Sequence, residues 1–209
     1  VLRPGTDLLP GDASTVSGVV LAAGSSKRFG GDTPKQLLEI GAEPLVRRTV
    51  ASALGANLSE VIVVVGHRGA DVRAALDGLA ARIVENPRFS EGQSTSVATG
   101  LRAVDPRARA AMFIPCDQPF LTVAVLDALI AAFDRTGGPI VVPQHGGRRG
   151  APVTFARALF AELEAIEGDV GGRSILPCHE DDIVTVELDN GQPLLDINTP
   201  EDYDGLKAT

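Results

Sequence analysis

VVLAAGSSKRFGGDTPKQLL, residues 19–38, begins as an apolar, β-branched run and passes through two alanines into a loop rich in glycine and basic side chains. The apolar run predicts a buried strand, and the glycines after it predict a loop whose backbone can approach a ligand closely. Unpaired backbone N–H groups and the cations Lys27, Arg28 and Lys35 would neutralise phosphate oxygens. The stretch therefore predicts a strand that runs into a polyphosphate-binding loop.

Two familiar phosphate-binding loops do not match this stretch. A Walker A loop ends in Gly-Lys-Ser/Thr, whereas Gly30 is followed by Gly31 and Asp32. A dinucleotide-binding fingerprint needs a second glycine where Ser26 stands. From this loop alone, an ordinary strand-to-helix turn with surface cations is the alternative interpretation, and the choice depends on the rest of the chain.

The composition is that of a globular, acidic protein. The 209 residues include 44% hydrophobic and 22% charged residues and carry a formal net charge of −8, which argues against nucleic acid or an anionic membrane as a partner. No apolar run approaches the roughly 20 residues needed to span a bilayer, and the first 15 residues lack the apolar core of a signal peptide. We therefore expect residues 1–15 to form a mobile tail, residues 16–209 to form a single domain, and the protein to be cytoplasmic.

Strand and helix patterns alternate along the chain, which predicts a layered α/β fold. The apolar runs at 61–65 and 110–115 are typical of strands buried on both faces of a parallel sheet. Shorter runs predict strands at 82–84, 139–143 and 183–188. Helical spacing of apolar residues predicts helices at 44–57, 70–80, 123–133, 156–166 and 199–206.

Two carboxylates are expected where open α/β sheets bind ligands, just beyond the carboxyl ends of strands. Asp117 follows the run at 110–115, and Asp196 is expected at the end of another strand near the C-terminus. Carboxylates in such places are candidate ligands of a divalent cation. Asp117 could instead cap the next helix, although Thr122 is nearer to that helix and is the better cap.

Two further segments carry groups suited to a nucleotide or an anion. Residues 89–99, FSEGQSTSVAT, place several hydroxyl groups around the start of a predicted helix. Ser94 or Thr95 could cap that helix, and the hydroxyl groups could also line a pocket beside the first loop. The basic loop at 145–152 could hold an anionic second substrate through its arginines, or it could be a solvated hairpin tip.

Together these features predict nucleotidyl transfer, in which a phosphate oxygen attacks the α-phosphorus of a nucleoside triphosphate and pyrophosphate leaves. Such a nucleophile is already ionised near neutral pH, so no general base is required. Catalysis would depend on positioning and charge neutralisation, by Mg²⁺ on Asp117 and Asp196 and by Arg28 and Lys35 on the leaving pyrophosphate.

A set of motifs in the chain resembles the MobA-like nucleotidyltransferases, most closely the molybdenum cofactor cytidylyltransferases of the MocA type. In order, the motifs are LAAGSSKRFGG, PKQLL, GQSTSVATGL, CDQPF, RRGAPVTF, GDVGGR and DINTPED. The resemblance implies a three-layer α/β/α Rossmann-like fold with a mostly parallel central sheet, and Mg²⁺ as cofactor. It also implies transfer of CMP from CTP to a molybdopterin-type phosphate acceptor, with a molybdoenzyme of the xanthine dehydrogenase type as a partner. Related guanylyltransferases usually have two glycines where this chain has Ala23 and Gly24, which favours CTP.

The resemblance also implies roles for individual residues. Leu21, Ala22 and Ala23 would contact the base through their backbone groups. The phosphates would be held by Gly24, Ser25, Arg28 and Lys35, and the base and ribose would lie near Gly92 and Ser96. Asp117 and Asp196 would bind the metal, and the acceptor would face Arg149, Gly150, Ala151 and Pro152.

The chain departs from the family pattern at Ala151, where a histidine is common, and at Gly172, where an alanine is usual. The loss of the imidazole leaves the nucleotide half of the site intact and leaves the acceptor open. The alternatives are GTP as the nucleotide, a methylerythritol phosphate or sugar phosphate as the acceptor, or a non-catalytic chaperone that binds molybdenum cofactor. The presence of Lys35, Asp117 and Asp196 argues against a purely binding role.

Overall fold

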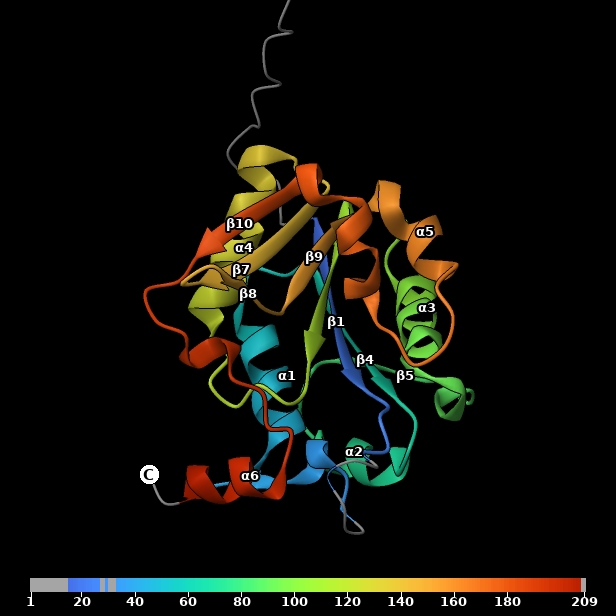
Figure 1. The fold of residues 1–209 in the computed structure, drawn as a ribbon. Coiled ribbons are helices and arrows are strands. Elements are labelled where there is room, and N and C mark those ends of the chain that lie inside the picture. The colour runs from blue at the N-terminus through green and yellow to red at the C-terminus, as the bar shows by residue number, and fades with distance from the viewer. Residues whose placement is uncertain (1–14, 27–28, 30–32, 208–209) are drawn as a thin grey trace, which may run out of the picture.

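The computed structural model describes residues 15–26, 29 and 33–207, and it shows a central sheet with helices on both faces (Figure 1). The parallel part of the sheet consists, in spatial order, of β5 (Arg82–Glu85), β4 (Glu60–Val65), β1 (Val16–Ala22) and β6 (Ala110–Pro115). Next to β6 lie the antiparallel β9 (Val153–Ala156), then β7 (Ile140–His145) and β10 (Ile183–Glu187), which runs parallel to β7. The predicted three-layer fold with a mostly parallel sheet is confirmed.

The central strand β1 sends alternate side chains into two cores. Val20 belongs to the core under α1 (Leu45–Gly55), α2 (Gly69–Ala75) and α4 (Val123–Thr136). Val19 belongs to the opposite core, under α3 (Gln93–Ala103) and α5 (Phe160–Glu164). Because helices cover both faces of the sheet, the second half of β1 is a continuous apolar run in the sequence.

Close packing of α3 on the sheet depends on Gly100. A Cβ atom at this position would lie 2.4 Å from Cγ1 of Val19, so only glycine allows the helix to approach β1 this closely. The approach brings the first turn of α3 to the same side of the sheet as the loop after β1, where the first turn of the helix can face a ligand.

The predicted helix starts and ends agree with the structure in part. Thr122 caps α4, because its Oγ1 accepts a hydrogen bond from the backbone N–H of Val125 at 3.4 Å. The helix predicted at 70–80 ends earlier, at Ala75. Within the described residues, no helix has the length and apolar character needed to cross a membrane. Of the expected tail, residues 1–14 lie outside the described part of the chain, and the carbonyl of Thr15 accepts a hydrogen bond from the Arg109 N–H at 2.8 Å.

The helix predicted at 156–166 is wrong at its start. The chain turns at two glycines after β7, forms the short strand β8 (Arg148–Arg149) against β7, and returns as β9 beside β6. A 3₁₀ turn, Arg157–Leu159, then leads into the short helix α5. Ala156, the first residue of the predicted helix, is the last residue of β9 and pairs with Ala110 of β6, so strand pairing decides its conformation. The structure shows a hairpin within residues 145–152, with His145 paired to Arg148, and the binding of an anionic second substrate by its arginines stays a prediction.

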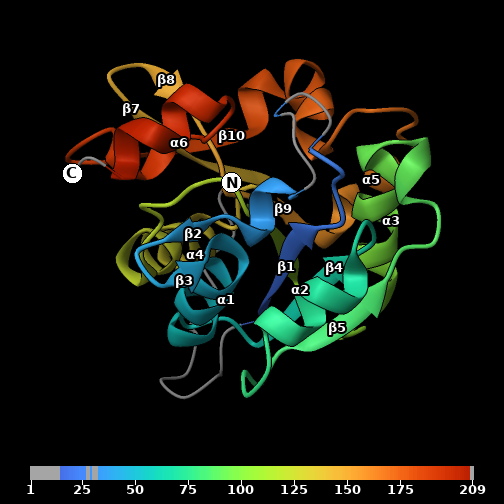
Figure 2. The ribbon, with the colours of Figure 1, turned by 90° about the horizontal axis from the view of Figure 1, so that it is seen from below.

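The strand predicted before Asp196 is also wrong. A 3₁₀ turn, Gln192–Leu194, precedes Asp196, and the chain then continues without regular structure to α6 (Pro200–Lys207). α6 lies at the end of the sheet towards which β1 points (Figure 1), and Figure 2 looks onto this end from below. The segment before α6 is held there by its contacts with the end of β6, since the N–H of Ile197 donates to the carbonyl of Asp117 at 2.8 Å. We call residues 195–199 the C-terminal segment.

Candidate functional site

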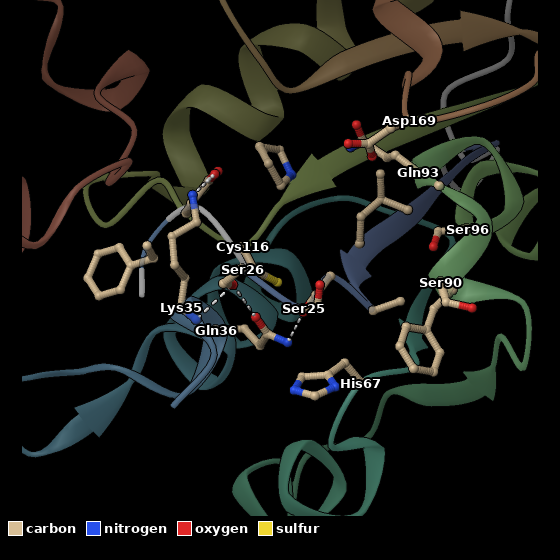
Figure 3. A pocket seen from close by; sticks show the side chains of 18 of the residues that line it. Ser25, Ser26, Lys35, Gln36, His67, Ser90, Gln93, Ser96, Cys116 and Asp169 are labelled. Carbon is tan, nitrogen blue, oxygen red and sulfur yellow. Dashed lines mark hydrogen bonds and ion pairs between the residues drawn. The ribbon is translucent and has the colours of Figure 1, made fainter. Parts of the chain in front are cut away.

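A cavity of about 850 Å³ opens at the carboxyl ends of β1 and β6. The chain connects β1 to β4 on one side and places β6 on the other, so the cavity lies where the strand order reverses, the usual ligand site of an open α/β sheet. Figure 3 shows Ser26 and Lys35 on one side of the cavity and Gln93 and Ser96 on the other. The volume suits a ligand of nucleotide size.

The side chain of Gln36 fixes the backbone of the loop after β1 through hydrogen bonds. The side chain of Gln36 is buried, and its amide donates to the carbonyls of Ala22 and Gly24 at 3.2 and 2.9 Å. Ser26 has a positive φ of 52° and accepts a hydrogen bond from the backbone N–H of Lys35 at 3.0 Å. These bonds fix the turn that places Lys35 at the cavity wall.

The ammonium group of Lys35 joins the loop, the end of β6 and the C-terminal segment. Its Nζ lies 3.0 Å from Oδ2 of Asp117, 2.7 Å from the carbonyl of Ile197 and 3.5 Å from Oδ1 of Asn198. An ammonium has three N–H donors, so the three contacts match its donor number. The ion pair with Asp117 is mostly buried, with side-chain exposures of 19% and 28%, and solvent screens it only in part.

Of the two predicted metal-binding carboxylates, Asp117 lines the cavity and Asp196 does not, although the residue after Asp196 is hydrogen-bonded to the backbone of Asp117. The carboxylate of Asp196 accepts a hydrogen bond from the amide of Gln118 at 3.0 Å. The surrounding protein removes part of the hydration of Asp196, and this, together with the negative charge of Asp117, raises the pKa of Asp196 above its ordinary value. Two hard oxygen donors whose charges repel each other form a suitable site for a divalent cation.

A cation at this place would have few protein ligands. Among the residues that the structure describes, no group of three or more His, Cys, Asp or Glu side chains is arranged to hold a metal. Mg²⁺ is commonly bound by one or two carboxylates and completes its coordination with water and substrate phosphate. Asp117 and Asp196 therefore fit Mg²⁺ that is shared with a phosphate ligand.

The opposite wall of the cavity is built by the first turn of α3. Gly92 has a φ of 126°, and a Cβ atom there would lie 2.3 Å from the carbonyl oxygen of Gly168, so the loop at 168–171 packs directly on this glycine. The capping role considered for Ser94 and Thr95 is wrong, because the helix has no side-chain cap and the hydroxyl of Thr95 donates to the carbonyl of Gly92. Ser96 lines the cavity instead.

The structure brings most of the predicted nucleotide-binding residues together. The predicted residues that line the cavity are Leu21, Ala23, Gly24, Ser25, Lys35, Gly92, Ser96 and Asp117. Ala22 is buried in the core on the face of α1, and Arg28 lies outside the described residues.

The predicted acceptor segment, residues 149–152, is not part of the cavity lining. Arg149 forms an ion pair with Glu180 at 2.7 Å, and Gly150 packs against the side chain of Leu194, two residues before Asp196. The segment therefore lies near the chain that leads to Asp196, and its arginine is paired with another part of the protein.

Sequence reasoning missed several residues that line the cavity. His67 and Phe89 form a tilted ring pair with centroids 6.0 Å apart, and both line the cavity together with Gln93 and Asp169. His67 could have been found, because it lies just beyond the carboxyl end of β4, as Asp117 does for β6. Asp169 belongs to the GDVGGR motif, but only the packing of that loop on Gly92 reveals that it faces the cavity.

Comparisons with known proteins agree with this architecture. The family of the MobA-like NTP transferase domain matches residues 18–183. Nicotine blue oxidoreductase from Paenarthrobacter nicotinovorans is 31% identical over 176 residues, which cover 79% of this chain and 83% of that protein. A probable molybdenum cofactor guanylyltransferase from Mycobacterium ulcerans is 25% identical over 192 residues, which cover 91% and 92% of the two chains.

Solved structures extend the similarity to the whole fold. Rv0371c from Mycobacterium tuberculosis H37Rv superposes with a TM-score of 0.82 at 30% identity, covering 95% of this chain and all of the other. Its complex with manganese gives a TM-score of 0.71 at 28% identity, covering 93% and 98%. The chain spans only 26% of the bifunctional GlmU protein of Carboxydothermus hydrogenoformans, to which it is 32% identical over 122 residues. From the family match over most of its length, this chain belongs to the MobA-like NTP transferase domain family.

Proposed function

We propose that this nucleotidyltransferase uses Mg²⁺ to transfer CMP from CTP to the terminal phosphate of a molybdopterin-type acceptor. The observation that carries the proposal is the pairing of Lys35 with Asp117 at the wall of a cavity lined by Gly24 and Ser25. A cation for phosphate oxygens, carboxylates for a metal and a glycine-containing loop are the groups that a metal-bound triphosphate requires.

The reaction forms a bond between an acceptor phosphate oxygen and the α-phosphorus, and it breaks the bond from that phosphorus to the bridging oxygen of pyrophosphate. The acceptor phosphate is ionised at neutral pH, so the chain needs no general base. Lys35 would turn from its protein partners to the phosphate oxygens and stabilise the departing charge. Mg²⁺ held by Asp117 and Asp196 would neutralise charge on the phosphates when bound.

The choice of CTP depends on Ala23, which lines the cavity at the end of β1. Its methyl group occupies space that a glycine would leave open, and a narrower site favours a pyrimidine over a purine. The mycobacterial relative named as a guanylyltransferase makes GTP the direct competitor in the test. An Ala23→Gly variant is expected to gain activity with GTP relative to CTP, measured as the ratio of the two kcat/KM values.

The molybdopterin-type acceptor is supported by the relative named as a molybdenum cofactor enzyme, which matches over almost the whole chain. A molybdoenzyme of the xanthine dehydrogenase type would then receive the product. Because Ala151 takes the place of the family histidine, the acceptor must be tested among several phosphates.

The deciding experiment measures pyrophosphate release from CTP, GTP, ATP and UTP with Mg²⁺ and either molybdopterin, a methylerythritol phosphate or a sugar phosphate. Release with CTP and molybdopterin, lost in Asp117→Asn, is the expected result. Release with GTP or with another phosphate would correct the base or the acceptor and keep the reaction. Molybdopterin binding without pyrophosphate from any nucleotide would instead assign the chain as a cofactor-binding chaperone.

A further inference from the structure

Gln118 connects the two carboxylate-bearing parts of the chain. It follows Asp117 directly, and its Nε2 donates to Oδ1 of Asp196, 78 residues further along the chain, at 3.0 Å. The backbone N–H of Ile197 donates to the carbonyl of Asp117 at 2.8 Å. One side-chain bond and one backbone bond thus hold the C-terminal segment in register with the end of β6.

The other half of the same amide is unsatisfied. Gln118 is 3% exposed, and among the described residues its Oε1 has no hydrogen-bond partner. A buried carbonyl without a partner costs free energy of folding, which an apolar side chain of equal length would avoid. Stability therefore does not explain an amide at this position, whereas its bond to Asp196 does.

The bond acts on a carboxylate that would otherwise be free to move. Asp196 is exposed as a residue and lies in a segment without regular structure, and the N–H of the next residue, Ile197, donates to the carbonyl of Asp117. Without the amide, the Asp196 carboxylate would lose this hydrogen bond, and its negative charge would favour positions in water and farther from the like charge of Asp117. A metal would then have to bring the two groups together as it binds.

We propose that Gln118 is a positioning residue that keeps the Asp196 carboxylate beside that of Asp117, ready to share a divalent cation. The inference rests on the proposed function, because it assigns a role within the metal site of that function. Side chains that orient metal ligands in this way commonly change metal affinity by about 10–100-fold when they are removed. Gln118 would not touch the nucleotide itself.

The test is a titration of the full chain with Mn²⁺, followed by the electron paramagnetic resonance signal of the free ion. Gln118→Met is expected to bind Mn²⁺ about 10–100-fold more weakly, with a Tm equal to or above that of the wild type. Binding of inorganic tripolyphosphate without metal should stay the same. Gln144→Met is the matched control, because Gln144 also donates to a carboxylate, that of Glu187 at 3.1 Å, away from the cavity.

The possible failures can be told apart. Equal Mn²⁺ affinity of Gln118→Met and the wild type would overturn the role of Gln118 and leave the metal site standing. No Mn²⁺ binding by the wild type, or binding unaffected by Asp117→Asn, would overturn the metal site and the proposed function with it. A fall in Tm alongside the loss of Mn²⁺ in both Gln118→Met and Gln118→Leu would assign Gln118 a structural role and overturn the proposal.

Discussion

At the scale of single residues, Lys35 and a bound metal ion would compete for the same carboxylate, that of Asp117. In the structure the ammonium of Lys35 is paired with Asp117, the same carboxylate that is proposed to bind the metal. Lys35→Met should therefore bind Mn²⁺ more tightly in the absence of nucleotide, by about 1 kcal/mol or roughly fivefold, since this is the upper end of the range for exposed ion pairs and this pair is mostly buried. The same variant should lose about 10²–10³-fold in kcat, the usual effect of removing one group that stabilises transition-state charge.

Lys35→Arg is the control for this prediction, because it keeps the positive charge next to Asp117. Isothermal titration with Mn²⁺ should give a dissociation constant close to that of the wild type. If Lys35→Met bound Mn²⁺ no more tightly than Lys35→Arg, the ammonium would not compete with the metal.

Gly92 is the residue where backbone conformation and close packing both exclude a side chain. Gly92→Ala would place a methyl group 2.3 Å from the carbonyl oxygen of Gly168 in a conformation with φ of 126°. Gly78→Ala is the matched control, since its φ is 79° and its Cβ would meet no atom within 4 Å. The control should lose about 1–2 kcal/mol of unfolding free energy from the backbone alone. Gly92→Ala should lose clearly more, which differential scanning calorimetry would show as a lower Tm; an equal loss would contradict the packing of the loop at 168–171.

At the scale of elements, a histidine links α5 to the chain before β10. His179 lies 2.9 Å from Glu162 in α5 and 3.2 Å from Asp182, and both carboxylates raise its pKa above the ordinary value, Glu162 most. Only the protonated imidazole can donate to both. The link therefore contributes its full stability below the unfolded pKa of about 6.5, and it is lost as pH rises through the higher folded pKa.

His179→Gln isolates this contribution from the titration of the rest of the protein. The unfolding free energy of wild type minus variant, measured with urea, should be larger at pH 5.5 than at pH 8.5. A difference that did not change between these two pH values would show that the ring stays neutral or that its partners are solvated.

The strands that were predicted correctly from the sequence are those buried on both faces. The runs in β4 and β6 are covered on both faces by helices, so the residues alone indicated strands. β9 was missed because its four residues acquire their strand conformation from pairing with β6 and β7, which no local pattern records. The segment before Asp196 was predicted as a strand from its apolar residues, yet Leu195 is 53% exposed and has no sheet beside it.

At the scale of the whole molecule, the cavity joins the loop after β1, the start of α3, the end of β6 and the C-terminal segment. A ligand that touches all four should stabilise the fold as a unit. CTP with Mg²⁺ at about 100 times its dissociation constant should add roughly 2.7 kcal/mol, or about 2–4 °C in Tm for each kcal/mol in a chain of this size. Asp117→Asn should remove the shift that depends on Mg²⁺; a shift that persisted there would place the metal elsewhere.

The parts of the site that could be predicted from the sequence are those that depend on local sequence and on the order of elements. Asp117 was predicted because it follows the carboxyl end of a buried strand, a rule that needs only the order of elements. Lys35 was predicted as a cation that follows a glycine-rich loop, which the local sequence shows by itself. Gln118 and Gln36 act through bonds to partners brought near by the fold, and Asp169 reaches the cavity through a loop packed on Gly92. Such residues become visible only once the chain is folded.

The C-terminal segment has a consequence for how the protein becomes active as it is made. The sheet strands end at Glu187, and the family match ends at residue 183, but the carboxylate of Asp196 comes later in the chain. All strands of the described sheet would thus be synthesised before Asp196, the second of the two proposed metal ligands. If Asp196 binds the metal as proposed, a chain cut after β10 would contain every strand of the described sheet and lack a proposed metal ligand, so it should lose turnover before it loses its strands.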